Sequence, residues 1–233
     1  MTDLELALSY APILHTDAAE TIPVRAVGYT VFRTAAASAS FPKRRIEPEA
    51  DGLVIEYAFY FDYDVEHMYD LEHIWVFVRP DGTLRDAQGS YHGKYLNLLI
   101  PGFPGALPPG GRRVHAFCQP GKHAFLASGE MTRLYPGWES CCTHAGGPVL
   151  IGNPFQAEWA PGGRDLFSPD ARDNRNSIRW LREHLSFTPS LRFQEQPPIS
   201  ASLLMPWTAL FEKIPVWIAD ECRRLSEFYS EEE

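Results

Sequence analysis

Alternating apolar and polar positions mark the first half of the chain as strand-forming. Residues 53–61, LVIEYAFYF, place Leu, Ile, Tyr and Phe at every second position, which predicts a strand with one continuous apolar face. Residues 71–79, LEHIWVFVR, predict a second strand that is apolar on both faces. Residues 80–82, Pro-Asp-Gly, form a turn signal before a third strand starting at Thr83. These segments indicate an antiparallel sheet.

The second half of the chain is less regular. Residues 101–111 are rich in Pro and Gly and predict a surface loop or lid, and residues 112–128 predict a further hairpin. Residues 129–167 show no clear period and are interpreted as loops with short strands. The pattern therefore predicts a mainly β protein over most of its length.

Helical spacing is found only late in the sequence. Residues 168–186 predict a helix with Ser168 as N-cap, Pro169 at the first helical position and Asp170 in the first turn. Residues 215–229 predict a second helix with a partial apolar stripe. No linker divides the chain, so one domain is expected over residues 1–233, with these helices at its C-terminal end.

Composition limits the classes of function. Of the 233 residues, 45% are hydrophobic and 22% are charged, which is typical of a globular protein. The net charge of −9 and the lack of a basic run disfavour nucleic acid as a partner. No apolar run is long enough to span a membrane, and the start of the chain lacks the pattern of a signal peptide. The cysteines, at positions 118, 141, 142 and 222, form no C-x-x-C pair, so reduced thiols and a cytoplasmic location are expected.

Residues 62–73, DYDVEHMYDLEH, concentrate five carboxylates and two histidines beside apolar strands. On an extended strand Asp70 and Glu72 point to one side and His73 to the other. Two neighbouring carboxylates repel each other unless a proton or cation compensates, and burial increases that cost. Together with His67, just before the strand, they suit a divalent cation. The competing interpretation is a solvated connection between two strands.

Three histidines near other predicted strands could complete a metal site: His92, His115 and His123. A single histidine is more often an ordinary polar residue than a ligand, and their clustering on neighbouring strands is what favours a site. Oxygen ligands with water favour Mg²⁺, Mn²⁺ or Ca²⁺, and additional histidines favour Zn²⁺ or Fe²⁺. A second chemical candidate, Ser140 beside Cys141, Cys142 and His144, has no nucleophile-elbow pattern.

The segment YAFYFDYDVEHMYDLEHIWVFV resembles the central segment of the necrosis- and ethylene-inducing toxin-like proteins, where an acidic residue and G-H-R-H-D-W-E precede an apolar strand. In that family the motif binds a divalent cation that supports membrane recognition. The resemblance implies cation ligands at His67, Asp70 and Glu72, with Asp64 or Asp62 as an upstream carboxylate.

The chain also resembles the Vps sixty-two-like proteins of plants and fungi. The shared segments are YAP at 10–12, DLEH at 70–73, YHGK at 91–94 and GKHA at 121–124. This resemblance implies a β-sandwich and makes His92 and His123 the preferred additional ligands. The full predicted ligand set is then Glu72, His92, His123, Asp70 and His67, with His73 or His115 as alternatives to His67.

The sequence favours a metal-dependent enzyme acting on a small polar substrate, either a hydrolase or a non-haem metal oxidoreductase. In the redox version, His92, His123 and Glu72 would form a facial triad. The alternative is a non-catalytic, metal-stabilised binding module for a lipid headgroup, glycan or protein. The metal, the substrate and the oligomeric state are left open.

Overall fold

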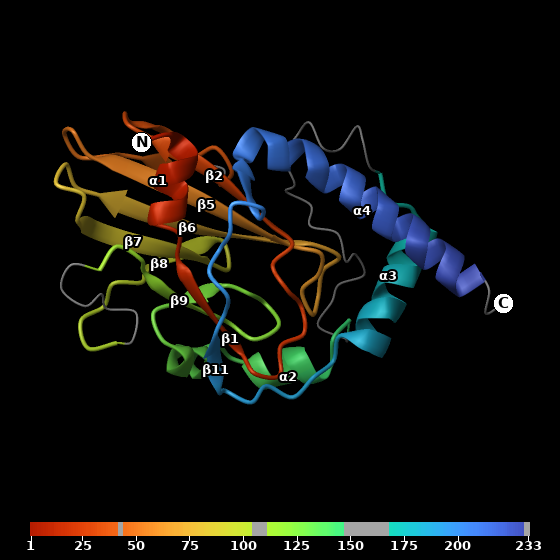
Figure 1. Cartoon of the computed structure of the whole chain (residues 1–233). Helices are drawn as coiled ribbons and strands as arrows, with labels where there is room; N and C mark the ends of the chain where they lie inside the picture. The colour runs from red at the N-terminus through yellow and green to blue at the C-terminus, as the bar shows by residue number, and fades with distance from the viewer. Residues whose placement is uncertain (42–43, 104–110, 147–167, 231–233) are drawn as a thin grey trace.

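A computed structural model describes residues 1–41, 44–103, 111–146 and 168–230. Two β-sheets pack together, and helices cover one end and one outer face (Figure 1). Sheet B has the order β12 (Leu204–Pro206), β2 (Ala26–Phe32), β5 (Leu53–Phe61), β6 (Asp70–Val78), β7 (Leu84–Tyr91) and β8 (Lys94–Asn97). Sheet A has the order β10 (Phe125–Leu126), β9 (His115–Cys118), β1 (Ile13–Asp17) and β11 (Phe193–Glu195). The prediction of a mainly β fold with two late helices is confirmed.

The remaining elements lie around these two sheets. The short strands β3 (Ala36–Ala37) and β4 (Arg45–Ile46) pair with each other. The other elements are α1 (Asp3–Ser9), the 3-10 helix η1 (Gly129–Leu134), α2 (Trp138–Thr143), α3 (Ala171–His184) and α4 (Trp207–Ser230). Among the described residues, no helix has the length and apolar character needed to cross a membrane.

The alternation predicted for β5 decides which side chains enter the core. Ile55, Tyr57 and Phe59 are fully buried between the sheets. They share that core with Ile74 and Val76 of β6, whose antiparallel register sets Phe59 opposite Glu72 and Phe61 opposite Asp70. Because Asp70 and Glu72 continue the inner face of β6, the core ends in a pair of carboxylates.

Part of the opposite face of sheet B is covered by the N-terminal part of α4, which then continues past the sheet to α3 (Figure 1). Ala58 and Tyr60 of β5 pack there against Leu210 and Ile214. Gly28 allows the close approach, since a Cβ at that position would lie 2.9 Å from Leu210 Cδ2. Strand β5 therefore has apolar neighbours on both faces.

Several predicted boundaries are corrected. The first late helix begins after Asp170, which is itself the N-cap with a capping box to Asp173, so Ser168 is not the cap. The second begins at Trp207 and continues through Pro215. Helices α1, α2 and η1 lie where strands and loops were expected. Parts of two predicted loop regions, at 104–110 and 147–167, lie outside the described residues.

Candidate functional site between the two sheets

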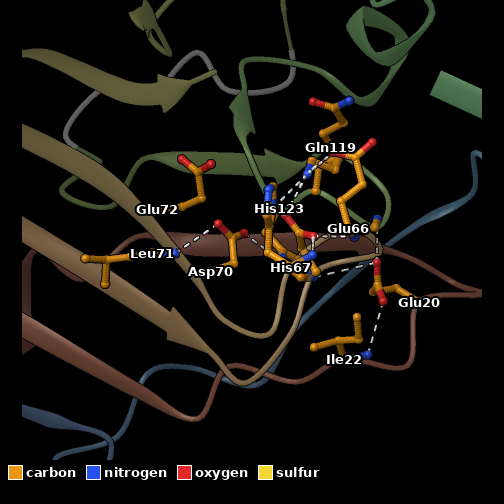
Figure 2. A network of polar contacts seen from close by, with 12 residues as sticks. Glu20, Ile22, Glu66, His67, Asp70, Leu71, Glu72, Gln119 and His123 are labelled. Carbon is orange, nitrogen blue, oxygen red and sulfur yellow. Dashed lines mark hydrogen bonds and ion pairs between the residues drawn. The ribbon is translucent and has the colours of Figure 1, made fainter. Parts of the chain in front are cut away.

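Charged side chains gather at the end of the sandwich where β6 begins and the β9–β10 connection turns back (Figure 2). We call this group the polar cluster. It consists of Glu20, Asp64, Glu66, His67, Asp70, Glu72, Lys122 and His123.

The segment between β5 and β6 is fixed by its own side chains. Asp64 Oδ1 accepts hydrogen bonds from the backbone amides of Glu66 and His67, both at 2.5 Å, which turns the chain back on itself. Val65 is fully buried, and its amide donates to the carbonyl of Gly121 at 2.8 Å. The acidic stretch is therefore not the solvated connection that was its alternative interpretation. It is held against the β9–β10 connection.

Lys122 supplies a positive charge that the sequence interpretation did not use. Its Nζ lies 2.6 Å from Asp64 Oδ2 and 2.9 Å from Glu66 Oε2, and its side chain is only 7% exposed. Burial opposes the charged form of Lys122, but Asp64 and Glu66 outweigh it and raise the pKa of the ammonium. The same contact, with His67, holds the pKa of Asp64 well below its usual range despite burial. An internal ammonium thus offsets part of the negative charge in one half of the cluster.

His67 belongs to that half. Its Nδ1 lies 2.8 Å from Asp64 Oδ2 and 3.3 Å from Lys122 Nζ. Burial lowers the pKa of His67, but Asp64 more than compensates, so the pKa is raised overall. The imidazole is one quarter exposed, which makes it one of the cluster residues that reach solvent.

Asp70 and His123 form the other half. His123 Nδ1 donates to Asp70 Oδ2 at 3.0 Å, while His123 Nε2 lies 3.8 Å from Glu20 Oε2. The ring is fully buried and stacks on Phe61 with centroids 3.9 Å apart. Nε2 has no hydrogen-bond partner among the described residues. Burial lowers the pKa of His123, but Asp70 and Glu20 raise it overall.

Glu72 is set apart from both basic groups. Its Oε2 accepts from the Ser90 hydroxyl, which in turn accepts from the His73 amide at 2.6 Å. Burial, and next the charge of Asp70, raise the pKa of Glu72 well above its usual value. The structure therefore shows the repulsion expected from the sequence. Asp70 and Glu72 are neighbouring carboxylates on one strand, and Glu72 has no ammonium or guanidinium partner among the described residues.

The predicted ligands are brought together only in part. Asp70, Glu72, His67 and His123 lie in the polar cluster, whereas His92 lies at its margin in the β7–β8 turn. His92 Nε2 donates to Gln119 Oε1 at 2.8 Å, and its ring stacks on Tyr135. Both His92 and His123 have positive φ, of 47° and 56°, a strained backbone conformation that is enriched at functional sites.

The alternatives to His67 lie elsewhere. His73 lies on the other face of sheet B, stacked on Trp75, where burial lowers its pKa to about 4. His115 lies in sheet A beside His15. Asp62 pairs with Arg25 rather than with the cluster.

The second chemical candidate has no catalytic geometry. Ser140 Oγ donates to the carbonyl of Gly137, while His144 Nδ1 contacts Thr143 and the carbonyl of Ser140, so no hydroxyl–imidazole pair forms between Ser140 and His144. Cys118, Cys141, Cys142 and Cys222 are all buried and free.

Sequence reasoning missed Glu20 and Lys122. Glu20 is tied by the backbone amides of Gly121 and Ile22, at 2.7 Å and 3.1 Å, and no periodic pattern points to it. Lys122 had a usable signal, because it directly precedes a predicted ligand histidine in GKHAF. A buried lysine beside acidic residues is an alternative to a metal ion for balancing their charge.

Comparison with known proteins adds little to this geometry. No protein-family description matches the sequence, and no curated protein matches it. A solved structure of NLPPya in complex with mannosamine is similar, with 16% identity and a TM-score of 0.35, over 52% of this chain. The aligned part spans 66% of that chain, which is a necrosis- and ethylene-inducing-like protein. A likeness this weak assigns this chain neither a family nor a ligand, and none of these matches supports the Vps sixty-two-like resemblance.

Proposed function

We propose that this chain binds one divalent cation beside Asp70 and Glu72, and that the cation serves a metal-dependent enzyme acting on a small polar molecule. One observation carries the proposal. Glu72 adjoins Asp70 on the inner face of β6, and the ammonium of Lys122 bonds Asp64 and Glu66 instead. A divalent cation would relieve that repulsion more fully than a proton on one carboxyl group.

Two carboxylates would hold the cation. Asp70 and Glu72 offer the oxygens, and since the described residues bring no third ligand atom close to both, water would fill the remaining positions. His123 Nδ1 donates to Asp70 and would orient that carboxylate, while His123 Nε2 lies 3.8 Å from Glu20 Oε2. Oxygen-rich ligation favours Mg²⁺, Mn²⁺ or Ca²⁺ over softer ions.

In such an enzyme the bound cation would polarise a substrate oxygen or activate water. The protein's own groups would do the rest. His67, one quarter exposed and beside Asp64, can accept or return a proton at the solvent side of the cluster. Lys122 would hold Asp64 and Glu66 in place.

The second candidate is a binding module in which the cation only fixes the geometry of the site. The burial of Asp70 and His123, with side chains 6% and 0% exposed, favours this alternative, because burial limits the access of a substrate to the cation. The location of the protein in the cytoplasm stays a prediction.

The test begins with the metal-free full chain, prepared without an affinity tag. Calorimetric titration with Mg²⁺, Mn²⁺ or Ca²⁺ should show about one equivalent bound, with a rise in thermal stability. Glu72→Gln should abolish both effects, while Glu212→Gln, at an exposed position of α4, should keep them. Heat of binding that is equal in the two variants would refute the proposal.

The same variants separate the two candidates. Turnover of small phosphate or carboxylate esters that needs the added cation and disappears in Glu72→Gln supports an enzyme. Cation binding without turnover, but with a cation-dependent rise in stability, supports the binding module.

A further inference from the structure

Sheet A carries a group of metal-ligating side chains on its outer face. His15 lies at the centre of this face on β1. The register sets Glu195 of β11 directly opposite His15, and sets His115 of β9 opposite Ile13, two residues away along β1. Inward-pointing Leu14 belongs to the core, so these three residues point the other way.

Their ligand atoms converge. His15 Nε2 lies 2.8 Å from His115 Nδ1, and one ligand atom from each of His15, His115 and Glu195 lies within 4.8 Å of the others. Nitrogen atoms this close require one of them to carry the proton and the other a lone pair. Each imidazole is partly exposed and Glu195 is exposed, so the group is open to ions from solution.

The position of the His15 ring is fixed by the side chain of Phe117. It stacks on Phe117 with centroids 4.5 Å apart and planes 13° apart, and Phe117 meets Phe193 edge to face. The three donor residues therefore lie on paired strands, and the His15 ring packs on an aromatic side chain. The site is largely preorganised, so an ion would have to order few side chains when it binds.

We propose that His15, His115 and Glu195 form a binding site for a transition-metal ion such as Zn²⁺, Ni²⁺ or Cu²⁺, with the remaining coordination positions open to water or a small ligand. Two imidazoles and a carboxylate on one face are the donor set that these ions favour, in contrast to the oxygen-rich set at Asp70 and Glu72. Around a tetrahedral zinc ion the two nitrogens would lie about 3.3 Å apart. A small outward rotation of the partly exposed rings reaches that separation.

The site differs from the polar cluster in its residues and in its chemistry. It lies on the outer face of sheet A, while Asp70 and His123 lie between the sheets. Its success or failure is therefore independent of the cation proposed there. His115→Ala, which leaves the residues of the polar cluster unchanged, serves as the variant that separates the two.

The experiment uses the untagged full chain, freed of metal by EDTA and dialysis. Zn²⁺ is titrated by calorimetry, and Cu²⁺ is then used as a spectroscopic probe by electron paramagnetic resonance. The expected result is one equivalent of tightly bound Zn²⁺, and a Cu²⁺ spectrum with coupling to two imidazole nitrogens. His115→Ala should weaken Zn²⁺ binding by at least about 100-fold and Glu195→Gln by about tenfold, since losing even a supporting residue costs 10–100-fold. The exposed-histidine control His144→Ala should leave the affinity unchanged.

A second measurement uses the wild-type chain, so it does not depend on whether a variant folds. Diethyl pyrocarbonate modifies accessible imidazoles, and mass spectrometry of peptides locates the modified residues. Zn²⁺ should protect His15 and His115 while His144 stays reactive. Equal modification of His15 and His115 with and without Zn²⁺ overturns the proposal, as does Zn²⁺ affinity that is unchanged in His115→Ala.

Discussion

Replacing Lys122 by Met removes the ammonium and keeps most of the buried aliphatic volume. In the native protein this ammonium contacts Asp64 and Glu66 at 2.6 Å and 2.9 Å, where the side chains of Lys122 and Asp64 are 7% and 2% exposed. Removing one partner of a buried ion pair leaves an uncompensated charge and costs about 3–5 kcal/mol. Glu66, at 19% exposure, can turn toward water, so the loss belongs mainly to Asp64.

For a chain of this size, about 3–5 kcal/mol corresponds to a fall in melting temperature of roughly 6–20 °C. The assay is urea denaturation at pH 7 in EDTA, so that no added cation replaces the ammonium, followed by thermal unfolding. Lys94→Met, at an exposed position of β8, is the control and should change the free energy of unfolding by less than about 0.5 kcal/mol.

The pH dependence sharpens this prediction. In the native protein the pKa of Asp64 is lowered, so its contribution is present above the unfolded value near 4 and is lost as the pH falls through the lower folded value. Lys122→Met removes the largest cause of that lowering. The difference in unfolding free energy between wild type and Lys122→Met should therefore shrink as the pH falls below about 4. A deficit under about 1 kcal/mol at pH 7, or one that stays constant into acid, would refute the charge balance described here.

Three further changes test other parts of the structure. In EDTA, Glu72→Gln should make the protein more stable than wild type at pH 8 but not at pH 4, because the raised pKa of Glu72 means that stability is lost as the pH rises; equal urea midpoints at pH 8 would contradict this. Gly89→Ala should cost about 1–3 kcal/mol of unfolding free energy, since its Cβ would lie 2.5 Å from Phe125 Cβ, and a neutral effect in urea would argue against this sheet packing. His73 has its pKa lowered to about 4, so its own contribution to stability is lost as the pH falls from about 6.5 toward 4; the stability of His73→Phe, still stacked on Trp75, should therefore rise relative to wild type over that range in the same assay.

The strands could be predicted because their signal is local. The alternation over residues 53–61 specifies both the strand and its buried face, and β5 begins and ends at those residues. Helix α1 was missed although Thr2 and Glu5 have the spacing of a capping box, and both of its hydrogen bonds form. The start of α4 was missed: the predicted helix covered residues 215–229, whereas α4 begins at Trp207 and continues through Pro215. Buried contacts of Leu210 and Ile214 with sheet B favour helix on the N-terminal side of that proline.

Local patterns predicted the candidate site only where its residues are close in the sequence, and His123 was added by the resemblance carried by GKHA at 121–124. Asp70 and Glu72 follow from strand alternation, and His67 from its nearness to them. Lys122 meets Asp64 across 58 positions, and His15 meets His115 across 100. Such contacts depend on how the sheets pack and on the parallel pairing of β1 with β9, for which a short sequence window carries no signal.

Lys122 reduces the number of carboxylates in the polar cluster that need a metal ion to balance their charge. The sequence suggested that the whole acidic stretch needs a divalent cation, but the ammonium of Lys122 already offsets one of the two charges of Asp64 and Glu66, and His67 lies beside Asp64. Among the described residues, Glu72 lacks such a partner next to Asp70, and His123 offsets part of the Asp70 charge by bonding it. A cation bound there would displace only the proton that the raised pKa of Glu72 favours, so its binding should release about one proton and tighten as the pH rises. Calorimetric titration with Mg²⁺ or Mn²⁺ in buffers of different ionisation enthalpy measures the number of protons released. Binding near pH 6 without proton release would show that the cation does not remove a proton from the Glu72 carboxyl group.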